Sequence, residues 1–286
     1  MVPFPPGGSL DVLTRLLQPR LAERLGATVV IENRAGAGTL IGTDAVAKAP
    51  ADGATALMIA NSFTINATLI RNPPFDARRD FTGVSFLAFN PHVLIANPRL
   101  NLRSVADVIE AARARGGLSY ASSGTGTSLH LGGESFRAAT GVPMTHVPYR
   151  GSPQAITDVI GGQVDLMFAN LPVAVPAIRD NRVTAIANPE RHVLLPEVPT
   201  FDEAGVRGVA SNSWFGMVAR SEVPAAILDR LAATIGQILA EPDSIARLVQ
   251  VGLATRPIAR AGFNTFLAEE FGRNARLIRE NNISPD

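Results

Sequence analysis

The sequence predicts an α/β protein of two lobes, with parallel strands in its sheets and helices on both faces. Short apolar strands alternate with helix-length segments along most of the chain, which is typical of parallel sheets. The 286 residues are enough for two lobes with separate cores, because single cores stop growing at roughly 250–300 residues. Loops rich in glycine and hydroxyl residues stand between several strands and helices.

The first part of lobe 1 is assigned to residues 1–97. The segment 3–9 is a loop by composition, and a leucine-lined face predicts the helix that follows it. The predicted elements are helix 10–25, strand 28–32, helix 39–48 and strands 56–60, 83–89 and 93–96. The polar run 61–66 follows a buried strand at its carboxyl end, where open α/β sheets bind their ligands.

Lobe 2 is assigned to residues 98–218, and the chain returns to lobe 1 over 219–286. The predicted strands are 118–121, 144–147, 164–169, 183–188 and 214–219. The predicted helices are 104–113, 128–138, 154–160, one that begins at 171, 225–240, 244–251 and 263–280. The pattern is therefore strand and helix in alternation, followed by a helical end.

The segment 118–138 joins a strand to a helix through the loop Ser122–Ser128, which reads SSGTGTS. Glycines allow a ligand to approach the backbone, hydroxyls donate hydrogen bonds, and the first N–H groups of a helix have no partner within the helix. Such a loop is suited to bind an anion. An ordinary turn with a Thr or Ser N-cap explains the same residues equally well.

Composition and motifs narrow the function to a small-molecule partner. The net charge of +1 gives no basic excess for nucleic acid, and the lack of cysteine excludes thiolate chemistry and disulfides. No apolar run reaches the ~20 residues that span a bilayer. The sequence lacks the Gly-x-Ser-x-Gly elbow of serine hydrolases, the phosphate-binding signatures and clustered metal ligands. His130 is interpreted as a structural histidine. We therefore expect no catalysis, no metal and no cofactor.

The remaining candidates for a functional site are the loops rich in glycine and hydroxyl residues, which come from both halves of the chain. A hinged binding protein would use such loops to enclose a small anion. Their order resembles the Bug or TctC family of periplasmic solute-binding proteins, which serve tripartite tricarboxylate transporters. The resemblance covers nearly the whole chain and is carried by seven stretches, namely 2–11, 32–38, 120–136, 146–151, 161–168, 195–200 and 213–216.

The resemblance implies a type II, or Venus-flytrap, fold that binds a carboxylate between its lobes without catalysis. The carboxylate seat maps onto Thr125, Gly126, Thr127 and Ser128. The water-holding first loop maps onto Pro5, Pro6, Gly7 and Gly8, and side contacts map onto Ser62, Thr64 and Asn170. Arg34 and Arg150 are the cations of interest, for which a surface or hinge role is the simpler interpretation. Asp11 is interpreted as holding the first loop without touching the ligand.

The resemblance also implies a periplasmic monomer whose partners are the permease subunits of the transporter. Two departures stand out. The family usually has a signal peptide and a first strand before Phe4, so we expect that this strand is truncated here. The segment 187–190 replaces a longer strand end rich in small hydroxyl residues, which leaves the contacts from that side of the cleft in doubt.

The ligand and the biological role stay open at this point. Di- and tricarboxylates, amino acids and aromatic acids all fit, and Leu10 and Phe63 favour an acid with an apolar part only if they do not serve the core. A sensor that presents the same module to a receptor kinase is the alternative to a transport receptor. An enzyme that depends on His130 is the third hypothesis.

Overall fold

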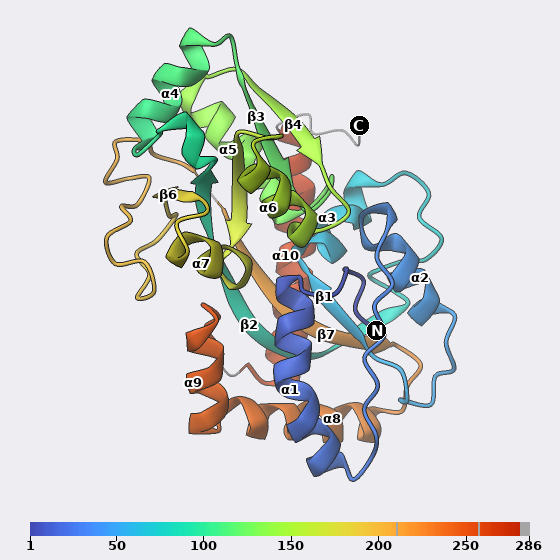
Figure 1. The fold of residues 1–286 in the computed structure, drawn as a ribbon. Coiled ribbons are helices and arrows are strands. Elements are labelled where there is room, and N and C mark those ends of the chain that lie inside the picture. Colours follow the sequence, from blue (N-terminus) through green and yellow to red (C-terminus); the bar gives the residue numbers. More distant parts are fainter. Residues whose placement is uncertain (210, 257, 281–286) are drawn as a thin grey trace.

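The computed structural model describes residues 1–209, 211–256 and 258–280, and the fold has two lobes (Figure 1). The helices are α1 (Ser9–Leu25), α2 (Leu40–Ala47), α3 (Asn61–Leu69), α4 (Val105–Ala114), α5 (Ser128–Thr140), α6 (Ser152–Gly161), α7 (Leu171–Arg179), α8 (Ala225–Leu239), α9 (Pro242–Gln250) and α10 (Arg260–Glu280). The strands are β1 (Leu57–Ala60), β2 (Phe81–Ala96), β3 (Leu118–Ser122), β4 (Met144–Pro148), β5 (Leu166–Asn170), β6 (Thr184–Ala187) and β7 (Asn212–Arg220). Short 3-10 turns precede α2 and α4.

The strands form a mixed sheet in the order β1-β7-β2-β5-β3-β4, with β6 paired to β2. Parallel pairing, which the strand–helix alternation predicts, joins β3 to β4 and to β5. The pairs β1–β7, β2–β7, β2–β5 and β2–β6 are antiparallel. The reason is that β2 and β7 run between the lobes in opposite directions, so they bring antiparallel neighbours into each half (Figure 1).

Strand β2 is the longest strand and crosses from one lobe to the other. Residues 81–91 pair with β7, and residues 92–96 pair with β5. The prediction of two separate strands is wrong here, because Asn90, Pro91 and His92 break the apolar pattern without breaking the strand. One buried core takes its members from residues 93–201, and two others combine the N-terminal segment with β1, β7 and the C-terminal helices. The lobe bounds at 97 and 218 stay a prediction.

Two further local predictions differ from the structure. Residues 28–32 form no strand, although Val2 makes a parallel bridge to Asn33 beside them and its N–H donates to Glu32 O. The polar run 61–66 is helical, because α3 begins at Asn61 directly after β1. This second difference places Ser62 in the first turn of a helix.

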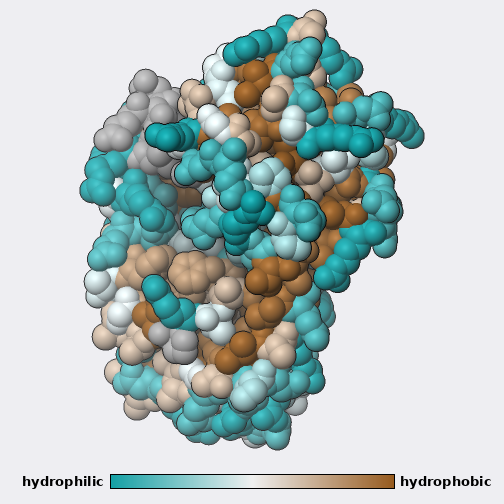
Figure 2. Space-filling view, turned by 90° about the vertical axis from the view of Figure 1, so that its left-hand side faces the viewer, coloured by the Kyte–Doolittle hydropathy of each residue, from teal (hydrophilic) through white to brown (hydrophobic). Residues whose placement is uncertain are grey.

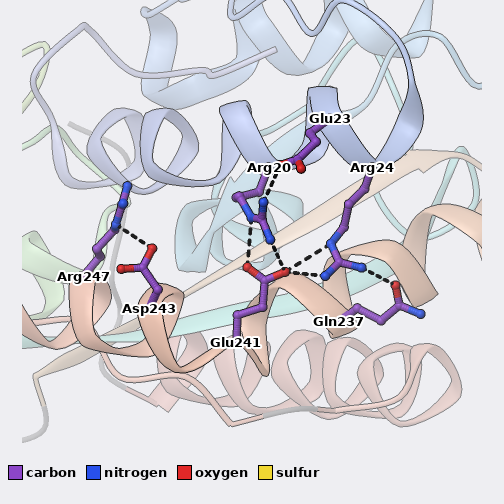
Figure 3. A network of polar contacts seen from close by, with 7 residues as sticks. All are labelled: Arg20, Glu23, Arg24, Gln237, Glu241, Asp243 and Arg247. Atoms are coloured by element: carbon purple, nitrogen blue, oxygen red, sulfur yellow. Dashed lines mark hydrogen bonds and ion pairs between the residues drawn. The ribbon is translucent and has the colours of Figure 1, made fainter.

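Ion pairs on the outer side of lobe 1 tie α1 to the junction of α8 and α9 (Figure 3). Glu241 accepts from Arg20 Nε at 2.9 Å and from Arg24 Nε at 3.1 Å. These hydrogen bonds lower the pKa of Glu241 to about 2. Hydrophilic residues cover both ends of the face in Figure 2, and apolar residues gather in a band along one side. No helix in the described ranges is long and apolar enough to cross a bilayer.

His92 makes the stability of this fold sensitive to acid. Its ring lies in β2 opposite Asn170 of β5, is 1 % exposed, and has Nδ1 at 2.7 Å from Ser211 Oγ. Burial lowers the pKa of His92 to about 3. The unfolded chain takes up a proton near pH 6.5, so the unfolded state binds more protons between about pH 6.5 and pH 3.

Acidification is therefore expected to destabilise the native state through this residue. Between pH 7 and pH 5 the contribution of His92 to the free energy of unfolding should fall by about 2 kcal/mol. Urea denaturation at both pH values, compared with His92→Asn, measures it. If the variant loses as much stability as the parent over this interval, His92 is not the titrating group.

Candidate functional site

A narrow cavity of about 30 Å³ lies between the lobes and has the space of roughly two water molecules. Half of the residues that line it carry a hydroxyl group, and none of the described lining residues is charged. The lining residues are Phe4, Pro5, Gly8, Ser9, Leu10, Ala60, Ser62, Ser123, Thr127, Ser128, Ser152, Asn170, Ser213 and Phe215.

The starts of several helices meet at this cavity. Ser9, Ser62, Ser128 and Ser152 lie in the first turns of α1, α3, α5 and α6, and Asn170 is the N-cap of α7. The first N–H groups of each helix have no partner inside the helix, and the helix dipole adds positive potential at that end. Helices α3 and α7 begin directly after strands β1 and β5, whereas loops that contain glycine lead into α1, α5 and α6. Such an arrangement is suited to an anion and does not require a cationic side chain.

Asp11 holds the first loop and does not line the cavity. Its carboxylate accepts hydrogen bonds from Gly7 N–H at 2.9 Å, Arg15 Nε at 2.9 Å and Asn33 Nδ2 at 3.0 Å. Burial by itself opposes ionisation of Asp11, but the hydrogen bonds from Arg15, Gly7 and Asn33 outweigh it, so the pKa lies below its ordinary value. The geometry agrees with the role expected for Asp11 from the sequence.

The loop Ser122–Ser128 presents only part of itself to the cavity. Ser123, Thr127 and Ser128 line the cavity, and Thr127 caps α5 by accepting from His130 N–H. Gly126 does not line the cavity. It has a φ of +74°, and its N–H donates to His130 Nδ1 at 3.4 Å. A Cβ at Gly126 would overlap Asn66 Oδ1 and lie 2.9 Å from Leu69 Cδ2, so this glycine allows lobe 2 to approach α3 of lobe 1.

A larger outer cavity of about 380 Å³ adjoins the inner one, and the two share Phe4, Ser123 and Thr127. Its walls come from residues 36–40 of lobe 1 and from residues 148–150 of lobe 2. Arg150 lines this outer cavity, whereas the other cation of interest, Arg34, is paired with Glu32 at 2.6 Å. A ligand can therefore place a carboxylate in the inner cavity and its remaining atoms in the outer one.

Some of the predicted site residues line a cavity, and the others do not. Six line the inner cavity, namely Pro5, Gly8, Ser62, Thr127, Ser128 and Asn170, and Thr125 lines the outer cavity. Pro6 and Gly7 are exposed in the first loop. Gly126 packs behind the cavity as described, and Thr64 is buried, where Thr64 Oγ1 accepts from Asn274 Nδ2 at 2.8 Å. Their roles in binding stay predictions.

Sequence reasoning missed several lining residues. They are Phe4, Ser9, Ala60, Ser152, Ser213 and Phe215. Serine in the first turn of a helix was the available signal for Ser9 and Ser152. Nothing local marks Ser213, because it reaches the cavity from crossing strand β7, where it donates to Asn61 Oδ1 at 2.8 Å.

One buried polar atom of the cavity wall has hydrogen-bonding capacity left. Ser9 Oγ has no hydrogen-bond partner, and Ser9 is 3 % exposed. Buried polar groups of this kind are normally satisfied, so they are suited to a polar ligand or the water around it. No group of three or more His, Cys, Asp or Glu side chains within the described part of the chain could hold a metal ion.

Comparison with known proteins agrees with this geometry. Residues 13–283 match the family model described as the tripartite tricarboxylate transporter family receptor, TctC. The protein BugT of Bordetella pertussis is 36 % identical over 286 residues, which cover 98 % of this chain and 87 % of BugT.

Solved structures show the same fold. R. palustris Rpa4515, solved with adipate, has a TM-score of 0.95 at 33 % identity, over 100 % of this chain and 97 % of that one. MatC from Rhodopseudomonas palustris, solved with bound malate, has a TM-score of 0.90 at 29 % identity, over 97 % of both chains. The chain therefore belongs to the TctC, or Bug, family of solute-binding receptors.

Proposed function

We propose that this protein is an extracytoplasmic receptor that binds a small carboxylate between its lobes and delivers it to the membrane subunits of a tripartite tricarboxylate-type transporter. The convergence of helix starts and hydroxyls on an uncharged inner cavity carries the proposal. Burying an anion without a counter-charge requires several hydrogen bonds to replace its hydration, and this wall offers them. The role is binding and release, without catalysis.

The two cavities suggest how a ligand lies. One carboxylate occupies the inner cavity against Ser128 and Ser9, and the chain of the ligand extends past Thr127 into the outer cavity. A second carboxylate would then come within reach of Arg150. We therefore propose a dicarboxylate of four to six carbons, a range that includes the adipate and the malate bound in the related structures.

The cell biology follows from the family. We propose a periplasmic monomer in which residues 1–97 and 219–286 form one lobe and residues 98–218 form the other. Binding of the carboxylate brings the lobes together around β2 and β7, and the closed form is the one that the membrane subunits recognise.

Uptake measurements test the transport role. A thermal-shift screen of dicarboxylates identifies a ligand, and cells that lack this gene should then fail to take up that compound in labelled form. Ligand binding with unchanged uptake would refute transport. If the ligand instead changes transcription through a receptor kinase that the closed protein binds, the module is a sensor.

A further inference from the structure

The ring of His130 lies directly behind the loop Ser122–Ser128, on the side away from the cavity. The residue is 5 % exposed and contacts the loop at two places. His130 Nδ1 accepts from Gly126 N–H at 3.4 Å, and His130 N–H donates to Thr127 Oγ1 at 3.4 Å. The ring therefore fixes the backbone at Gly126, immediately before the two residues that face the cavity.

A stack of three rings holds His130 in place. The His130 and His146 rings are 4.1 Å apart at 20°, and the Tyr120 ring stacks on His146 at 5.0 Å. Tyr120 Oη donates to Glu134 Oε1 at 2.7 Å, and Glu134 lies on the same helix as His130. A Cβ at Gly133 would overlap the Tyr120 ring, so the ring can pack against α5 only because residue 133 has no side chain.

The stack is attached to both ends of the loop. His146 Nε2 lies 2.7 Å from Ser122 Oγ, and Ser122 Oγ accepts from Gly124 N–H at 3.1 Å. The other end is held by His130 through Gly126. In the contact with Gly126 N–H, His130 Nδ1 is the acceptor.

We propose that His130 is a positioning residue for the carboxylate seat, which sets the orientation of Thr127 and Ser128 through its Nδ1 acceptor without touching the ligand. The consequence for affinity rests on the proposed function, whereas the consequence for the Gly126 amide does not. A hydrogen bond to a neutral acceptor contributes a factor of about five in an equilibrium constant. Loss of the acceptor should therefore loosen the loop and weaken binding by about that factor.

Three substitutions separate the acceptor from simple packing. His130→Asn places an amide oxygen at the position of Nδ1 and keeps the acceptor. His130→Gln places its amide one bond farther, near the position of Nε2, and His130→Leu has no acceptor. The Asn and Gln variants are a matched polar pair, so the comparison stands even if the Leu variant does not fold.

Two measurements are made on the parent protein and on each variant. The first is the exchange rate of the Gly126 amide by NMR, which needs no ligand, and the second is calorimetric titration with adipate and with malate. We expect His130→Asn to keep a protected Gly126 amide and affinity within threefold of the parent, and His130→Gln and His130→Leu to lose the protection and bind about fivefold more weakly.

Each outcome decides a different claim. Equal protection of the Gly126 amide in the Asn and Gln variants, or loss in both, overturns the positioning role, because the acceptor position would then be irrelevant. If the parent protein binds neither probe, the carboxylate proposal loses its support while the amide measurement still decides the role of His130.

Discussion

Substitution of Gly126 by valine is expected to weaken carboxylate binding by about 10- to 100-fold. The new Cβ would overlap Asn66 Oδ1 and crowd Leu69 of α3. Overpacking costs about 1–3 kcal/mol, and the cost falls on the arrangement of the lobes seen here, in which lobe 2 touches lobe 1 at Gly126. Calorimetric titration of the variant with the carboxylate that the parent binds measures the loss.

Gly141→Val is the matched control. Gly141 has a φ of +65°, close to the +74° of Gly126, and a Cβ there meets nothing within 4 Å. Both variants carry similar backbone strain, but only Gly126→Val opposes lobe closure. Equal carboxylate affinity in the two variants would show that closure of the lobes does not require a residue without a side chain at position 126.

Asp11→Ala is expected to lower the free energy of unfolding by about 2–4 kcal/mol and to weaken binding as well. The substitution leaves the N–H of Gly7 and the side chains of Arg15 and Asn33 without their buried acceptor. Gly8 and Ser9 of the cavity wall follow that loop directly, so their positions depend on it. Urea denaturation and titration of the same sample give both quantities.

Asp107→Ala provides the comparison for this second prediction. Asp107 also lies in the first turn of a helix and accepts from Ser104 N–H at 3.0 Å, but it caps α4 away from the cavity. Its loss should lower the stability less than the loss of Asp11 does and leave binding unchanged. Parent-like binding by Asp11→Ala would mean that the first loop needs no anchor.

Local patterns were sufficient for the elements whose packing is amphipathic and whose ends carry capping residues. The helix at 104–113 was predicted from the sequence, and the structure has α4 there with a full capping box formed by Ser104 and Asp107. The strand, loop and helix at 118–138 were likewise predicted from the residues alone.

Other features of the structure depend on tertiary contacts, which local sequence patterns do not reveal. The polar run 61–66 has weak helix propensity, yet it is helical because buried partners such as Asn274 satisfy its side chains. The cavity lining was predictable where it follows a strand or begins a helix, as at Thr127 and Asn170. Ser213 joins it from a strand 85 residues beyond Ser128, a proximity that only the crossing of β7 creates.

Calorimetric titration with adipate and with its uncharged diamide tests the central claim most directly. The helix starts around Ser9, Ser62 and Ser128 should favour the negative charge of the acid, whereas the diamide has the same length without the charge. We predict one-to-one binding of adipate, or of another dicarboxylate of four to six carbons, with no measurable heat from the matching diamide. Equal binding of acid and diamide, or no binding of any dicarboxylate in that range, would contradict an anion seat between the lobes.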